Sequence, residues 1–425
     1  MDLRFLAKDS NWVAELDRLY GALGAPSNAL LLPRHFIEVV LPKLGGKIAL
    51  FVEGGREIGV GFLFPRAPEN SASVDPVLKP AFTLRFHALA PETSYFPADF
   101  VQLLNRHLPH AHIVYYDPGA PHTYLATAQA FGDLNIGHPS AEEVGPIRQA
   151  HQQIWGSPPE SLYPADMYSN EFGLGTALTA RVDGAVAGFL FGFYRVGGST
   201  LPADWAERFN GDWRIESQAM GVLPAQRGKR LAYLLKWEQA RLARQQGVSL
   251  INWTADPLQF ANAALNFGLL RAVAFDFYAD LYPFRNELNQ APASRFGLTW
   301  LVQTTRVAEL SPQDARAALL DLRTAPDVQR INAGIQQIAD PTAAQIAIEI
   351  PSDWTALQRT NLDQTLAWRA ATDALFAQYI GCRAGQYVVT GVGVDADRRF
   401  LIAEQADDSL WEKLSQISMI GEGIN

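Results

Sequence analysis

The amino-acid sequence predicts an α/β protein of the α+β kind, in which the sheets contain both parallel and antiparallel strands. Hydrophobic residues make up 48% of the 425 residues and charged residues 19%, which is ample apolar material for buried cores. Short β-rich runs alternate with longer stretches of helical spacing, and the same order of runs occurs twice. Together these observations favour two copies of one α/β unit, followed by a C-terminal α/β segment.

Two predicted β-hairpins carry the repeat, at residues 48–64 and 176–194. In the second hairpin, two β-rich runs flank Asp183-Gly184, which is a two-residue turn signal. Both hairpins contain the sequence Gly-Phe-Leu-Phe in their second strand. Because this strand is almost wholly apolar in each case, we expect it to lie at the centre of a sheet.

The repeat extends on both sides of the hairpins. A helix-like stretch precedes each one, at residues 11–21 and 141–156. After each hairpin come a strand, a helix and an apolar strand that is closed by Asp-Pro, at residues 117–118 and 256–257. The match of four features in the same order favours a duplicated unit over two unrelated hairpins.

These patterns divide the chain into four parts. We expect a first copy at residues 1–135, a second copy at 136–305, a helical connector at 306–345 and a C-terminal α/β segment at 346–425. The first copy ends in a predicted helical stretch at 123–131, which leaves no room for a closing strand pair. The C-terminal segment has the order strand, helix, strand, strand, so the sequence predicts that it folds back and completes the N-terminal sheet.

Charge and cysteine content exclude several classes of function. The formal net charge of -9 disfavours binding to nucleic acid or to a membrane surface. The apolar runs fall short of the ~20 residues that span a bilayer, and the first residues do not open a signal peptide, so we expect a cytoplasmic protein. The single cysteine, Cys382, excludes an intramolecular disulfide. His107, His110 and His112 have only Asp117 as a nearby acidic ligand, so we expect no metal site.

The second copy contains a basic loop between a strand at residues 213–222 and a helix at 233–246. Six basic residues and one acidic residue lie between Gln226 and Arg244, a local balance of +5 in a chain of net charge -9. The free N–H groups at a helix N-terminus favour anions, and the basic side chains add to this preference. The pattern indicates a phosphate-bearing ligand, and the alternative is a basic helix face that is merely solvated.

Residues 222–232, Val-Leu-Pro-Ala-Gln-Arg-Gly-Lys-Arg-Leu-Ala, resemble the acyl-coenzyme A signature of the GNAT acyltransferase superfamily. That signature runs from Gln or Arg to Gly at the fourth position and Gly or Ala at the sixth, and Arg227 and Ala232 fit its first and sixth positions. The resemblance covers roughly residues 138–305. It implies an acyl-coenzyme A N-acyltransferase (GNAT) fold in tandem, of a sparsely characterised branch, with a degenerate N-terminal copy.

The resemblance also implies where the coenzyme binds. Backbone N–H groups of the loop would hold the pyrophosphate, and the pantetheine would lie beside the strand before the loop. The implied coenzyme-binding residues are Met220, Gly221, Val222, Gln226, Arg227, Gly228, Lys229, Arg230, Leu231 and Ala232. The first copy has Pro-Glu-Thr-Ser-Tyr-Phe-Pro at residues 91–97 instead, with one acid and no basic residue, so we expect no coenzyme there.

The sequence departs from the family pattern at three positions. Arg230 in the loop and Arg271 at the end of the fourth helix stand where the family has glycine, which allows unusual φ and close approach of the backbone. Arg230 could instead supply a guanidinium to the phosphate. The helical tyrosine that often protonates the departing thiolate aligns with Phe267. Either Tyr278 or Tyr282 must replace it, or that step uses water.

Glu216, on the strand before the loop, is the candidate general base. The family commonly uses a carboxylate at this strand, directly or through water, and a carboxylate partly removed from water is a stronger base. The alternative is a structural ion pair with Arg214 or Arg195.

The resemblance implies acetyl-CoA, or another acyl-CoA, as co-substrate. The acyl group would pass directly to an amine on a small molecule or peptide, with no covalent enzyme intermediate. Whether the protein forms a homodimer is left open by the sequence. The alternative function, kept open by Arg230 and Phe267, is a non-catalytic acyl-CoA-binding or assembly protein.

Overall fold

The computed structural model describes residues 1–25, 27–67, 79–90, 95–173, 175–198, 201–209, 211–282, 290–314 and 316–417. The chain forms two compact units. The first comprises Met1–Ser199 and Asp212–Gln239, and the second comprises Thr200–Gly211 and Ala240–Asn425. The boundaries predicted at residues 135, 305 and 345 therefore stay predictions. Among the described helices, none is long and apolar enough to cross a membrane.

The first unit contains a five-stranded sheet in the order β1-β2-β3-β4-β5. Its strands are β1 (Asp2–Phe5), β2 (Lys47–Glu53), β3 (Arg56–Arg66), β4 (Ala81–Ala88) and β5 (His112–Tyr116). Neighbouring strands are antiparallel, except that β4 and β5 run parallel. The π-helical turn η1 (Phe36–Val40) and α2 (Leu41–Lys43) lead into β2.

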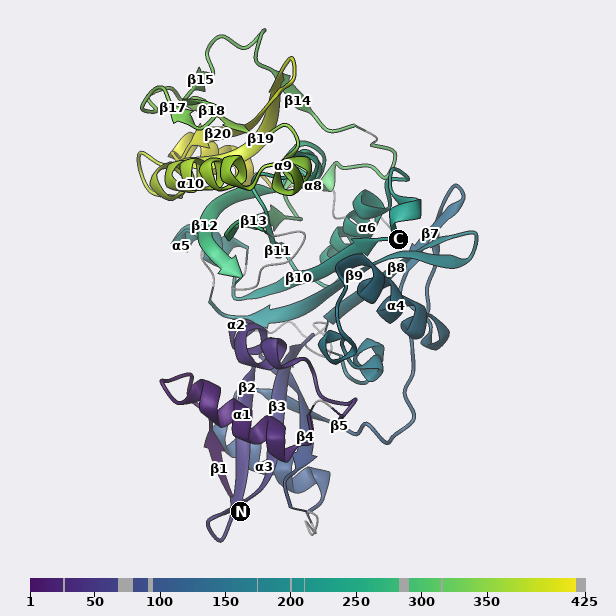
Figure 1. Ribbon diagram of the computed structural model, residues 1–425. Helices are drawn as coiled ribbons and strands as arrows, with labels where there is room; N and C mark the ends of the chain where they lie inside the picture. The colour runs from purple at the N-terminus through teal and green to yellow at the C-terminus, as the bar shows by residue number, and fades with distance from the viewer. Residues whose placement is uncertain are drawn as a thin grey trace. The chain divides into compact units, whose positions relative to one another are not determined.

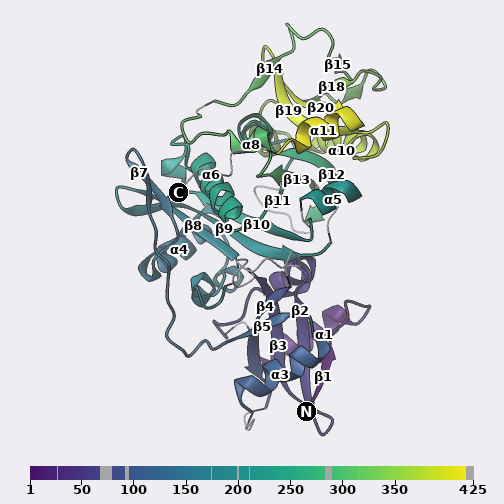
Figure 2. The ribbon, with the colours of Figure 1, turned by 180° about the vertical axis from the view of Figure 1, so that it is seen from behind.

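One helix covers each face of this sheet, because side chains alternate along the strands. In β2, Ile48 and Leu50 share a core with helix α1 (Trp12–Ala22). Ala49 and Phe51 share the opposite core with helix α3 (Pro97–His107). Helix α1 lies in front of the sheet in Figure 1, and α3 lies in front of it in Figure 2.

The first unit also contains the antiparallel strands β6-β7-β8-β9-β10. They are β6 (Gln129–Phe131), β7 (Leu134–Gly137), β8 (Gly175–Val182), β9 (Ala185–Val196) and β10 (Trp213–Val222). Asp183 and Gly184, with φ of 51° and 78°, form the predicted two-residue turn between β8 and β9.

Helices cover both faces of this second set of strands. The short 3₁₀ turn η2 (Ala141–Glu143) leads into α4 (Val144–Trp155), which packs through Ile147 and Ala150 against Phe189. Helix α6 (Leu231–Gln245) lies on the opposite face, where a Cβ on Gly192 would collide with the side chain of Gln239. The 3₁₀ turns η3 (Pro159–Ser161), η4 (Ala165–Tyr168) and η5 (Pro224–Gln226) complete this part.

The element order that the sequence predicts twice is present in the structure. The first stretch runs α1, β2, β3, β4, α3, β5, and the second runs α4, β8, β9, β10, α6, β11 (Leu250–Ala255). Each stretch also begins with a short strand, β1 or β7, which the sequence did not predict. Four residues are too few for an alternating pattern to be told from coil.

The second unit contains strands in the order β11-β13-β12-β19-β20-β18-β15, and β14 pairs with β19. The strands beyond β11 are β12 (Val273–Tyr282), β13 (Ala293–Leu301), β14 (Leu319–Asp321), β15 (Gln329–Arg330), β18 (Gln345–Ile350), β19 (Tyr387–Asp395) and β20 (Arg398–Gln405). The helices are α5 (Ala203–Arg208), α7 (Phe260–Ala263), the π-helical η6 (Ala264–Leu269), α8 (Thr305–Ala308), α9 (Trp354–Thr360), α10 (Leu362–Tyr379) and α11 (Asp408–Ser415). The predicted order strand, helix, strand, strand after residue 346 is confirmed.

The prediction that the C-terminal segment completes the N-terminal sheet is wrong. In the structure β19 pairs with β12, at Ala274 and Val389, and β20 and β18 continue outward from β19. All five strands described in the N-terminal sheet come from residues 2–116. The unpredicted strand β1 covers the edge of β2. The apolar strand β12, with Val273 and Phe275 buried, is the edge on which the C-terminal segment packs instead.

Two helical predictions are also wrong. In the stretch 123–131, the last three residues form β6 and pair with β7. The described part of the connector 306–345 begins in α8 and continues as short strands, including the hairpin β16 (Asn332–Ala333) and β17 (Gln336–Gln337). Leu322 and Val328 of the connector are buried with Phe400 of β20. Tertiary packing of these few apolar residues therefore overrides the weak helical spacing.

Candidate active site

The candidate base Glu216 lies on β10, opposite Phe193 of β9. Its Oε2 atom is 3.2 Å from Nη1 of Arg195, and both side chains are about one-fifth exposed. Of the two ion pairs that the sequence left open, the structure forms the one with Arg195. The Arg214 guanidinium donates to the carbonyl oxygen of Gly198. The Glu216 carboxylate is thus held in place by a cation and still reaches solvent.

A second cation lies near the same carboxylate. Burial lowers the pKa of the Lys43 ammonium at the end of α2, and the negative charge of Glu216 opposes that shift. Sequence spacing alone does not bring Lys43 to β10, because the two residues are far apart in the chain.

On the opposite face of β10, the structure reveals a buried amine that the sequence did not single out as a site residue. Lys236 of α6 is 2% exposed, and its Nζ atom donates to Oγ of Ser217 at 2.8 Å. Gln239, one turn further along α6, donates to Oγ1 of Thr176 at 3.3 Å. Burial lowers the pKa of Lys236 well below its ordinary value, and Glu216 opposes the shift. These contacts form a buried polar network on the α6 face of the sheet, from Ser217 of β10 to Thr176 of β8.

This finding corrects the count of positive charge around the loop. Lys236 is one of the six basic residues behind the predicted local balance, but as a buried amine it adds little charge to the surface. The sequence contained a sign that Lys236 is buried. Ala232, Lys236, Gln239 and Ala243 share one face of the helix, and the other three residues on that face carry no charge. A lysine in such a row faces the sheet.

The order strand, loop, helix that the sequence predicts after residue 213 is confirmed. The strand passes through a register shift between Ser217 and Ala219, and its last residues lead into η5. Gly228 has φ 83°, and helix α6 then begins at Leu231, two residues before the predicted start. The first turn of α6 contains no acidic residue, and the side chains of Arg227 and Lys229 are exposed. The loop thus presents two exposed cations beside a helix N-terminus.

Arg230 and Arg271, which stand where the resemblance implies glycine, both adopt the left-handed backbone conformation. Arg230 has φ 62° and Arg271 has φ 59°. The Arg230 guanidinium lies over the ring of Tyr233, 5.7 Å from its centroid, and Arg271 donates to the carbonyl oxygen of Arg306. The backbone therefore keeps the conformation for which glycine is suited, and the arginine side chains make contacts of their own.

The candidate acids lie in the second unit, whereas Glu216 and the loop lie in the first. Tyr278 and Tyr282 both belong to β12, and Phe267 is buried in η6. The Tyr282 hydroxyl is 3.0 Å from Oγ1 of Thr254 on β11, and the Tyr278 side chain is exposed. A register shift between the two tyrosines separates their surroundings.

Within the described residues, no group of three His, Cys, Asp or Glu side chains is placed to hold a metal ion. His107, of the His107, His110 and His112 cluster, instead places Nδ1 3.1 Å from the carbonyl oxygen of Leu103.

Comparison with solved structures finds acetyltransferases. The ribosomal-protein-S18-alanine N-acetyltransferase from Escherichia coli is 12% identical, with a TM-score of 0.30, and the match covers 40% of this chain and 94% of that one. An acetyltransferase of the GNAT family from Streptococcus pneumoniae is 11% identical (TM-score 0.30, 39% of this chain, 97% of that one). The polyamine N-acetyltransferase of Drosophila melanogaster is 17% identical (TM-score 0.29, 40% and 98%).

No family model matches the chain, and no curated protein matches it. The order of hairpin, strand, loop, helix, strand and helix that the sequence resemblance implies is present in the structure.

Proposed function

We propose that this protein binds an acyl-coenzyme A at the loop between β10 and α6 and transfers the acyl group to an amine. The observation that supports it most is the turn at residues 222–232. It joins the end of a sheet strand to a helix N-terminus with no acid in its first turn, and it carries the exposed cations Arg227 and Lys229. Such a turn suits a pyrophosphate.

In the proposed reaction the neutral amine attacks the carbonyl carbon of the thioester. A C–N bond forms, the C–S bond breaks, and its electron pair leaves on sulfur. Glu216 takes the proton that the nitrogen loses, directly or through a water molecule. The sulfur receives a proton from Tyr278, from Tyr282 or from water. Acetyl-CoA is the proposed co-substrate, and the acceptor is a small-molecule or peptide amine.

The test begins with binding. Isothermal titration of the full chain with acetyl-CoA, coenzyme A and a longer acyl-CoA should give saturable binding, and the charge-reversed variant R227E/K229E should bind at least about tenfold more weakly, since each charge-assisted contact contributes roughly 1.5–3 kcal/mol. An absence of binding by the wild type would contradict the proposal.

Turnover is then measured as thiol release from acetyl-CoA with a panel of amines. Release that depends on one class of amine supports the acyltransferase function and identifies the acceptor class. Tight binding without release on any amine would instead support the second candidate, a non-catalytic acyl-CoA-binding protein. The observation that favours this candidate is Phe267, which is buried and has no hydroxyl where the family has its tyrosine.

A further inference from the structure

A cluster of positive charge surrounds the candidate base Glu216 in the first unit. Because side chains alternate along a strand, Glu216 shares one face of β10 with Arg214, and Arg195 lies directly opposite Arg214 on β9. The carbonyl oxygen of Gly198 accepts from both guanidinium groups, at 3.0 Å from Arg195 and 2.6 Å from Arg214. The Arg195 side chain is therefore held on this face, 3.2 Å from the Glu216 carboxylate.

The segment η1–α2, far away in the sequence, brings a further cation to the same face. The rings of Phe36 in η1 and Phe193 in β9 lie 4.7 Å apart, and Phe193 is the residue directly opposite the candidate base. The end of α2 is fixed to β9 by a hydrogen bond of 2.8 Å from the Val196 N–H to the Leu44 carbonyl oxygen. Lys43, the last residue of α2, directly precedes this contact and is exposed. Its ammonium group is thus accessible beside the candidate base.

The charges that act on Lys43 are mostly positive. Burial lowers the pKa of its ammonium, the negative charge of Glu216 opposes that shift, and the positive charges of Lys8 and Arg195 add to it. Three cations thus share one carboxylate, in a chain whose formal net charge is -9. Since Arg195 already pairs with Glu216, Lys8 and Lys43 leave positive charge that no carboxylate in this cluster balances.

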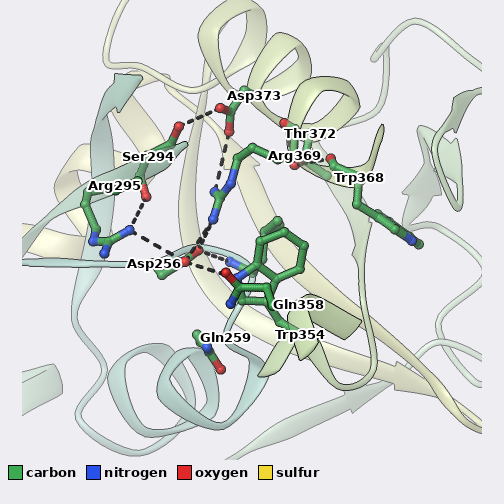
Figure 3. A network of polar contacts seen from close by, with 12 residues as sticks. Asp256, Gln259, Ser294, Arg295, Trp354, Gln358, Trp368, Arg369, Thr372 and Asp373 are labelled. Atoms are coloured by element: carbon green, nitrogen blue, oxygen red, sulfur yellow. Dashed lines mark hydrogen bonds and ion pairs between the residues drawn. The ribbon is translucent and has the colours of Figure 1, made fainter. Parts of the chain in front are cut away.

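A buried ionic network in the second unit has a different charge balance (Figure 3). Asp256, which follows β11, has both carboxylate oxygens 2.8 Å from Nη2 of Arg369 on α10, and Nη1 of Arg295 on β13 lies 3.5 Å from its Oδ2 atom. Oδ1 of Asp373 lies 3.6 Å from Nη1 of Arg369. Two guanidinium groups here meet two carboxylates, so these four residues hold α10 to β11 and β13 and offer a ligand no surplus charge.

Surplus positive charge beside a general base determines which amines can bind there. An acceptor that carries its own anionic group can place that group on Lys43 and Arg195, where charge-assisted hydrogen bonds are strong. Because Nη1 of Arg195 lies 3.2 Å from the Glu216 carboxylate, an amine on the same carbon atom as the anionic group, or on the next carbon, would reach the base. A purely cationic amine is repelled, since it meets three cations and one carboxylate.

We infer that the acceptor is an anionic amine, in which a carboxylate or phosphate lies one or two carbon atoms from the amino group, and that Lys43 and Arg195 bind this group beside Glu216. The inference rests on the proposed acyltransferase function and uses residues of the first unit alone. The anionic group takes no part in bond formation, and it holds the amine at the base. Amino acids and aminoalkyl phosphates are the two sources of such a group.

The first test measures binding and needs no turnover. Saturation-transfer NMR of the full chain, with and without coenzyme A, compares alanine, glutamate and phenylalanine with their α-carboxamides, and 2-aminoethyl phosphate with ethanolamine. The members of each pair differ in the anionic group, and putrescine is the cationic probe. We expect saturation transfer to the anionic member of at least one pair, and none to its neutral partner or to putrescine. The pair that responds identifies carboxylate or phosphate as the group.

Variants then locate the binding site. K43M and R195M should weaken binding of the anionic amine at least about tenfold, whereas K43R should keep most of it because it preserves the charge. The matched control K47M removes an exposed lysine at the start of β2, whose ammonium lies over the ring of Phe5, and should bind as the wild type does. Circular dichroism checks each fold, and R195K replaces R195M if that variant does not fold. Unchanged binding in K43M and in the Arg195 variant, or equal transfer to both members of every pair, would overturn the inference.

Turnover separates the failure of this inference from that of the proposed function. With an anionic amine that the wild type acylates, K43M should raise KM for the amine about tenfold and leave KM for acetyl-CoA within about twofold. If the wild type acylates neutral or cationic amines in preference, the inference fails and the acyltransferase function stands. If it acylates no amine while anionic amines bind at Lys43 and Arg195, the acyltransferase function fails and the anion site remains as the ligand site of a non-catalytic protein.

Discussion

At the scale of single residues, Arg230 shows a conflict between side chain and backbone. Its φ of 62° is a conformation that disfavours any residue with a Cβ by roughly 1–2 kcal/mol. Glycine would remove this strain and lose about 0.5–1 kcal/mol through its greater freedom in the unfolded chain. We therefore expect R230G to raise the free energy of unfolding by up to about 1 kcal/mol in urea titrations. R230A keeps the strain and should give no gain, so equal effects of the two variants would contradict this account.

The coenzyme affinity of R230G tests whether Arg230 binds the phosphate. If the role of the Arg230 guanidinium is its contact with Tyr233, 5.7 Å from the ring centroid, the variant should bind acetyl-CoA about as well as the wild type in a titration. A large loss of affinity would identify Arg230 as a phosphate ligand.

Glu216 allows a test of the chemical step. Replacement by glutamine keeps the size of the side chain and removes its basicity, so E216Q should lower turnover by the ~10²–10⁴-fold typical of a lost general base. Coenzyme affinity should be unchanged, as measured by titration. The matched control E309Q alters an exposed glutamate after α8. A wild-type rate in E216Q would reduce Glu216 to the structural partner of Arg195.

The buried Lys236 predicts a pH dependence of stability. Its pKa in the folded chain lies well below 10.5, so between those two values the unfolded chain binds one more proton than the folded chain. Stability should therefore rise with pH through this window, by at most about 1.4 kcal/mol per pH unit. K236M should remove that slope in urea titrations between pH 7 and 10, whereas K79M, at an exposed lysine, should keep it. Parallel pH profiles of K236M and the wild type would contradict the assignment.

At the scale of elements, the two helices that follow β4 and β10 differ at their N-termini. In α3 the Asp99 carboxylate accepts from the backbone N–H of Phe96 at 2.9 Å, so an acid already occupies the positive end of the helix. In α6 no acid lies in the first turn. We expect coenzyme to bind only at α6. Titration of R106E, on α3, should give wild-type affinity, in contrast to R227E/K229E, and a coenzyme found at α3 would contradict this.

The sequence predicts the elements of both copies well because their signals are local. The turn at Asp183-Gly184 and the apolar run of β9 each need only a few neighbouring residues. The pairing of β1 with β2 and of β12 with β19 joins segments that are far apart in the chain. No local pattern at Asp2–Phe5 or Val389 indicates which strand is the partner. The candidate site divides in the same way. Arg227 and Glu216 follow from a motif, whereas the approach of Lys43 to Glu216 needs the contact of α2 with β9, more than 100 residues away.

At the scale of the whole molecule, the C-terminal segment supports the second unit through its contacts with β12 and α5. Trp411 of α11 contacts both Trp205 and Phe275, and β19 pairs with β12, so a chain that ends at Thr305 would expose an apolar face in the second unit and leave Asp256 without Arg369.

We therefore expect truncation after Thr305 to abolish hydrogen-exchange protection in β11, β12 and β13, while β1–β5 keep theirs, since every described strand of that sheet comes from residues 2–116. The matched variant R369M, which keeps the whole segment, should reduce protection only near the end of β11. Loss of protection in β1–β5 with retention in β12 would show that the segment supports the N-terminal sheet after all, against the strand pairing observed.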